Sequence, residues 1–120
     1  MVRLCRGQLD FYSGNDDHII PVMSLGGKGV ISVLSNIAPG PVHDLCAAYF
    51  RGNIREAAKM QIDYIRLIKA LFCEVNPIPV KEAANMLGLG CGPCRLPLTP
   101  MEEANKQKLA AELRRMGLLQ

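Results

Sequence analysis

The sequence contains no tryptophan, and only six of its 120 residues are phenylalanine or tyrosine. Proteins that bind single-stranded nucleic acid stack the bases on aromatic rings, so this scarcity argues against that class. A large charge of one sign is also missing: the formal net charge is only +3, and the basic residues are scattered along the chain. We therefore expect no nucleic-acid partner.

Long apolar runs are missing as well. No run approaches the roughly 18 apolar residues that a membrane-spanning helix needs, so we expect no membrane contact. The first residues lack the apolar core of a secretory signal peptide. Five cysteines, an odd number without such a signal, are typical of free thiols in a reducing compartment. The sequence thus indicates a cytoplasmic protein.

The first 36 residues have the pattern of a strand, a loop, a helix and a second strand. Residues 9–13 and 29–34 have the composition of strands, and between them apolar residues recur at helical spacing up to Gly26. Asn15 or Asp16 is expected to cap this helix. Two parallel strands joined by a helix leave their edges uncovered. The pattern therefore predicts one part of a larger parallel α/β architecture.

After residue 36 the sequence predicts only helices and connectors. Gly and Pro positions bound the expected helices at residues 39–52, 53–72, 80–87 and 99–116. Thr99 would cap the last of these helices, with Pro100 in its first turn. Residues 89–98 are expected to form an irregular linker.

Two segments are candidates for a binding site. Residues 13–17 follow a predicted strand at its C-terminal end, where active sites form in parallel α/β folds. From composition alone, a turn at Gly14 followed by a helix cap is the favoured explanation of this segment, because such caps are common. The two prolines after Asn76 would present its side chain in a fixed direction, or would simply stiffen a connector. Residue types alone leave these alternatives open.

Four strings of residues together resemble the C-terminal part of the dihydrodipicolinate synthase family: Ser13-Gly14-Asn15-Asp16, Leu25-Gly26-Gly27-Lys28-Gly29-Val30-Ile31-Ser32-Val33, Asn76-Pro77-Ile78-Pro79-Val80-Lys81 and Arg95-Leu96-Pro97-Leu98-Thr99-Pro100. That family has an α/β fold, a (β/α)8 TIM barrel followed by a helical C-terminal domain. The resemblance implies that residues 9–13 and 29–34 are the last two barrel strands. It divides the chain into a barrel remnant, 1–52, and a helical C-terminal domain, 53–120.

The resemblance also implies a chemistry. Family members are pyruvate-dependent lyases of lysine biosynthesis, in which a lysine forms a Schiff base with pyruvate that then attacks aspartate semialdehyde; no cofactor or metal is implied. Ile31 matches a position whose backbone carbonyl lies beside pyruvate. Gly14 and Asn76 match positions near the second substrate, and Asp16 matches a polar residue of the same loop. Asn15 departs from the aspartate of many members, which makes this loop less acidic.

The catalytic groups of the family match no residue here. Its Schiff-base lysine lies on the sixth strand and its proton relay lies earlier, whereas none of the six lysines of this chain matches that position. We therefore expect the chain alone to be inactive, with pyruvate and aspartate semialdehyde bound only in a complete barrel. The alternative is a structural module that forms homo-oligomers or complements a separately encoded N-terminal half.

The string Cys91-Gly92-Pro93-Cys94 spells the thioredoxin-type redox motif. That motif depends on a helix directly after it, whose N-terminus activates one thiol. Here Arg95-Leu96-Pro97 follows instead, so a thiol-redox protein is the less favoured alternative and ordinary thiols are expected. A zinc site would need two further ligands close to these cysteines, and the sequence does not place them there.

Overall fold

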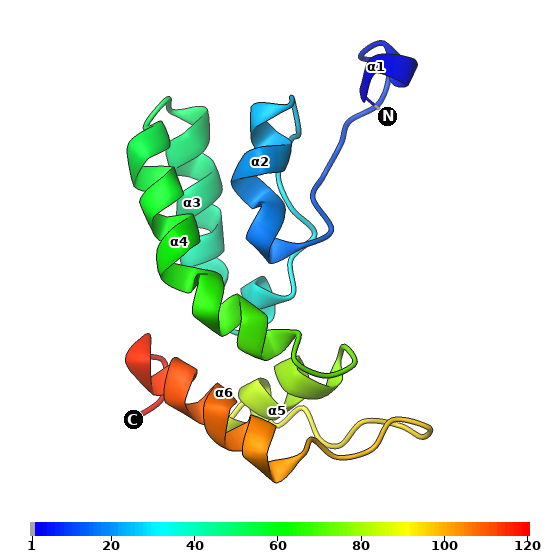
Figure 1. The fold of residues 1–120 in the computed structure, drawn as a ribbon, viewed down its shortest axis with the longest axis vertical. Coiled ribbons are helices and arrows are strands. Elements are labelled where there is room, and N and C mark those ends of the chain that lie inside the picture. The colour runs from blue at the N-terminus through cyan, green and yellow to red at the C-terminus, as the bar shows by residue number, and fades with distance from the viewer. Residues whose placement is uncertain (1) are drawn as a thin grey trace.

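A computed structural model describes residues 2–120, with side chains from Leu4 onward. Its α-helices are α1 (Val2–Cys5), α2 (Ile19–Ser24), α3 (Pro39–Phe50), α4 (Ile54–Leu71), α5 (Ile78–Met86) and α6 (Glu103–Arg115). Two short 3₁₀ helices, η1 (Asp16–His18) and η2 (Leu34–Asn36), precede α2 and α3. In Figure 1, α2, α3 and α4 lie side by side, while α5 and α6 lie below them, against the C-terminal half of α4. Within the described part of the chain, no helix is both long and apolar enough to cross a membrane.

Helix α4 joins the two parts of the molecule. Its N-terminal half packs on α2 and α3, and its C-terminal half contacts α5 and α6. Leu67, Ile68 and Leu71 of α4 are buried in the larger core cluster, which draws residues from both sides of position 52. Lys106 of α6 forms a 2.5 Å ion pair with Glu82, which ties α6 to α5. Our division of the chain at residues 52 and 53 stays a prediction.

The two expected strands need a correction. Between residues 2 and 120 the structure has helices and only one parallel bridge, between Ser13 and Val30. Three backbone hydrogen bonds of 2.7–2.8 Å pair the segments: Lys28 N–H to Phe11 O, Ser13 N–H to Gly29 O and Ile31 N–H to Ser13 O. A ladder this short does not make a strand, because neither segment has a further neighbour within the described residues. The parallel direction of the pairing agrees with the expectation.

The helix boundaries differ from the expectation at two places. Helix α5 begins at Ile78, two residues before the predicted start at residue 80, because a proline such as Pro79 is tolerated in the first turn of a helix. Helix α6 begins at Glu103, so the predicted start at Thr99 is wrong. Glu74 Oε1 accepts hydrogen bonds from Glu102 N–H at 3.0 Å and from Asn105 Nδ2 at 2.9 Å. A side chain distant in sequence therefore caps this helix.

Candidate functional site

The loop of residues 13–17 follows the paired segments, at the end where the sequence predicted a site. Ser13 is buried, and its Oγ donates a 2.8 Å hydrogen bond to Asn15 O while accepting one of 3.3 Å from Asn15 N–H. This local ring shapes the turn around Gly14. Gly14 is exposed, and an added Cβ would find no atom within 4 Å. The loop thus presents open space at the residue that the family resemblance singled out.

Asp16 has a structural task that the sequence did not predict. Its side chain is fully buried, and Oδ2 accepts hydrogen bonds from Val33 N–H at 2.9 Å and from Leu34 N–H at 3.0 Å. Its other oxygen accepts from the Ser32 hydroxyl. A carboxylate at this place satisfies the free amides at the start of η2. The expected cap on its own helix is therefore wrong, and the substrate contact that the resemblance implies stays a prediction.

Gln61 of α4 completes this arrangement, and the sequence analysis missed it. The side chain is buried, its Nε2 donates a 2.8 Å hydrogen bond to Asp16 O, and its Oε1 accepts one of 3.4 Å from Ile20 N–H. The sequence did carry one signal for Gln61: it is a polar residue on the apolar face of a long helix. A side-chain amide buried there without a hydrogen-bond partner would destabilise the fold. Gln61 fixes the loop and the start of α2 against α4.

Ile31 precedes η2 in the chain, and Asn76 shares a groove with Asn36 of η2. The Ile31 side chain is 72% exposed, and its backbone is held by the pairing with Ser13. Asn76 is exposed and lines a groove of about 330 Å³, which also includes Asn36, Lys81 and Cys91. The structure thus brings Gly14, Asp16 and Ile31 together through the paired segments, and it sets Asn76 on the neighbouring groove.

A second groove flanks the loop on the side of α4. It has a volume of about 270 Å³ and is lined by Asn15, Asp17, Ile68, Lys69 and Phe72. The side chains of Asn15 and Asp17 and the amine of Lys69 therefore border the same groove. Among the side chains that the structure describes, no cluster of three or more His, Cys, Asp or Glu residues is arranged to hold a metal ion.

The cysteine motif lies in the linker between α5 and α6. Cys91 and Cys94 are free thiols, and the next helix begins only at Glu103. The irregular linker is as expected. Elsewhere, burial raises the pKa of the Cys46 thiol. Burial, followed by the nearby Glu74 carboxylate, raises the pKa of Cys73. Both effects disfavour the reactive thiolate.

Comparisons with known proteins agree with the motifs. A model of the dihydrodipicolinate synthetase family matches residues 1–116. The 4-hydroxy-tetrahydrodipicolinate synthase of Lachnoclostridium phytofermentans is 52% identical over 119 residues, which are 99% of this chain and 40% of that protein. A solved structure described as the first monomeric dihydrodipicolinate synthase variant superposes with a TM-score of 0.93 at 44% identity, over 98% of this chain and 39% of that one.

A further solved structure, the dihydrodipicolinate synthase of Thermotoga maritima, has a TM-score of 0.90 and 42% identity over 98% of this chain and 40% of its own. The chain therefore spans about 40% of the length of the relatives it matches. Such identity over nearly all of the 120 residues confirms the resemblance to the C-terminal portion of these proteins. The chain belongs to the dihydrodipicolinate synthetase family.

Proposed function

We propose that this chain forms the C-terminal wall of a lyase site that condenses pyruvate with aspartate semialdehyde in the cytoplasm. The parallel pairing of Ser13 with Val30 is the observation that carries the proposal. It sets the loop of residues 13–17 beside Ile31, at the end of the paired segments where ligands gather in barrels of this kind. Relatives with the synthase name support the reaction class.

Each of the four residues has a proposed role in that site. The Ile31 carbonyl would lie beside pyruvate, and Gly14 and Asn76 would line the place of aspartate semialdehyde. The exposure of all three supports these roles. Asp16 would act at the same loop, where its hydrogen bonds already hold residues 32–34 in place. We assign no cofactor or metal to this reaction.

We further propose that the isolated chain is catalytically incomplete. Schiff-base catalysis needs a lysine whose amine is desolvated and so loses its proton near neutral pH. The amines of Lys59 and Lys106 instead hold their protons more tightly, because hydrogen bonds to Asp63 and Glu82 raise the pKa of each amine. The Schiff-base lysine would come from a separate N-terminal half of the barrel.

A structural module is the second candidate function. Tyr12 and Ile31, which belong to the paired segments, are 53% and 72% exposed. Apolar side chains exposed in this way favour self-association or pairing with another chain. This candidate differs from the first in predicting assembly without any gain of activity.

Reduction with borohydride in the presence of pyruvate tests the proposal. The isolated chain should gain no pyruvyl adduct by intact-mass spectrometry, whereas a complete relative treated in parallel should gain one. A fragment of that relative with the first six barrel strands should gain the adduct and condensing activity when this chain is added. A specific adduct on a lysine of this chain, or a stable but inactive mixed complex, would contradict us.

A further inference from the structure

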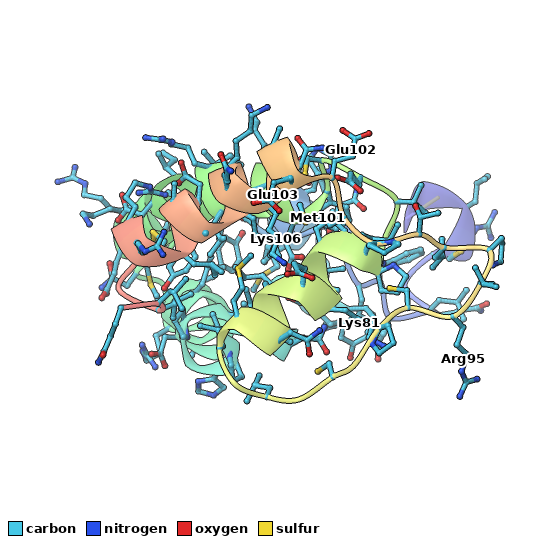
Figure 2. The ribbon with its side chains drawn as sticks, turned by 90° about the horizontal axis from the view of Figure 1, so that it is seen from below. Lys81, Arg95, Met101, Glu102, Glu103 and Lys106 are labelled. Atoms are coloured by element: carbon cyan, nitrogen blue, oxygen red, sulfur yellow. The ribbon has the colours of Figure 1, made fainter. Side chains whose placement is uncertain are left out.

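The linker of residues 89–100, here called the strap, is held against α5 by three hydrogen bonds. Asn85 Nδ2 donates to Gly92 O at 3.0 Å, and Gly92 N–H donates to Asn85 Oδ1 at 3.1 Å. Lys81 Nζ donates to Pro93 O at 2.8 Å. Figure 2 shows the strap leaving α5, reaching its far end near Arg95 and returning toward Glu102. The bonds therefore hold the two residues between the cysteines.

The thiols lie on either side of this attachment. Cys91 is exposed, and Cys94 is half-buried against the larger core cluster. Residues 89–95 form neither a turn nor a bend. A disulfide needs the two Cα atoms within about 7 Å, which over four residues requires a tight turn. The attached strap thus opposes closure of a ring between Cys91 and Cys94.

The strap also has room to move. A cavity of about 550 Å³ lies between it and α5, lined by Lys81, Asn85, Cys94 and Thr99 among others. The neighbouring groove at Asn76 has Cys91 in its wall. A change in the strap would therefore alter both spaces.

We propose that Cys91 and Cys94 are a reversible oxidation site, at which disulfide formation releases the strap from Asn85 and Lys81. The oxidant is a small disulfide such as oxidised glutathione. The exposed Cys91 thiolate attacks one of its sulfurs and expels one thiolate; the Cys94 thiolate then attacks the mixed disulfide and expels the second. Two protein thiols are oxidised, one disulfide is reduced, and the expelled thiolates take up the two protons.

This inference does not rest on the lyase proposal. It also differs from thioredoxin-type catalysis, because the strap is modified by an oxidant and transfers nothing to a substrate. Asn85 and Lys81 oppose oxidation, because their hydrogen bonds to the strap must break before Cys91 and Cys94 can form a disulfide. Substitutions that remove these hydrogen bonds should therefore favour formation of the disulfide.

Equilibration in glutathione buffers tests the coupling, in a chain whose other three cysteines are alanine. Acid quenching and mass spectrometry should detect the loss of two hydrogens between Cys91 and Cys94. Asn85→Ala should raise the equilibrium constant for the disulfide about tenfold, because two hydrogen bonds no longer oppose it. Asn53→Ala, a matched change at an exposed asparagine of another loop, should leave it unchanged.

Two further measurements complete the test. Lys81→Met removes only the bond to Pro93, so it should raise the constant by a smaller factor, and circular dichroism checks that each variant keeps its helices. Hydrogen exchange at the Gly92 amide should be faster in the oxidised chain, since that amide loses Asn85. Mixed glutathione disulfides alone, an unchanged constant in both variants, or unchanged Gly92 exchange would overturn the proposal.

Discussion

Asp16 accepts a 3.0 Å hydrogen bond from the backbone N–H of Leu34, 18 positions further along the chain. One fully buried carboxylate thus caps η2 and fixes the loop that precedes α2. A buried carboxylate is tolerated only when donors surround it, and here Ser32, Val33 and Leu34 supply them. The geometry of the candidate site depends on this contact.

Asp16→Ala should lower the free energy of unfolding by about 2–4 kcal/mol, because the buried N–H of Leu34 and the part-buried N–H of Val33 lose their acceptor. Urea denaturation followed by circular dichroism measures the change. Asp17→Ala is the matched control: Asp17 is partly exposed and contacts His18 at the surface, so its loss should cost no more than about 0.5 kcal/mol. Equal effects of the two substitutions would refute the role of Asp16.

Glu74→Ala should destabilise the chain by about 1 kcal/mol, the usual effect of losing a helix cap. Its carboxylate holds Glu102 N–H and the Asn105 amide at the start of α6. Thr99→Ala should have no measurable effect, since α6 begins four residues later. Thermal or urea unfolding compares the two variants. A larger cost for Thr99→Ala would mean that the sequence-based cap is the true one.

Alkylation of Cys46 should require a higher pH than alkylation of the same thiol in the unfolded chain, because burial raises its pKa. Since the folded pKa exceeds the unfolded value of about 8.5, this thiol's contribution to stability is complete below that pH. It is lost as the pH rises through the folded pKa. Iodoacetamide rates between pH 7 and 10, with residue-level mass spectrometry, give the profile. A Cys46 profile at or below that of the urea-unfolded chain would disprove the expectation.

The isolated chain should self-associate at micromolar concentration, because its paired segments expose apolar side chains. A two-fold dimer is the commonest way to cover such a surface. Ile31→Asp should shift the equilibrium toward monomer, while Ile62→Asp, at 69% exposure on α4, should not. Sedimentation velocity distinguishes the species. A monomer near 13.1 kDa that binds no hydrophobic dye would argue against this surface as the interface.

Much of the helical part could be predicted from the sequence. The expected helices at residues 39–52 and 53–72 agree with α3 and α4 to within about two residues, because periodic apolar positions and Gly52 are local signals. The motifs also located the loop around Gly14, which lies where the paired segments end. The apolar face of α4 could have drawn attention to Gln61, but its contact with Asp16 O spans 45 positions, so no local pattern could identify this partner.

The sequence by itself determined the family, the long helices and the irregular course of the strap, because each depends on neighbouring residues or on a recognisable string. Only the tertiary structure decided which side chain caps which helix. Thr99 has suitable chemistry to cap α6, yet Glu74 does so, and Asp16, expected to cap the helix that follows it, caps η2 instead, because the fold brings these oxygens to the free amides. A free amide bonds whichever acceptor the folded chain places within reach, whatever its distance in sequence.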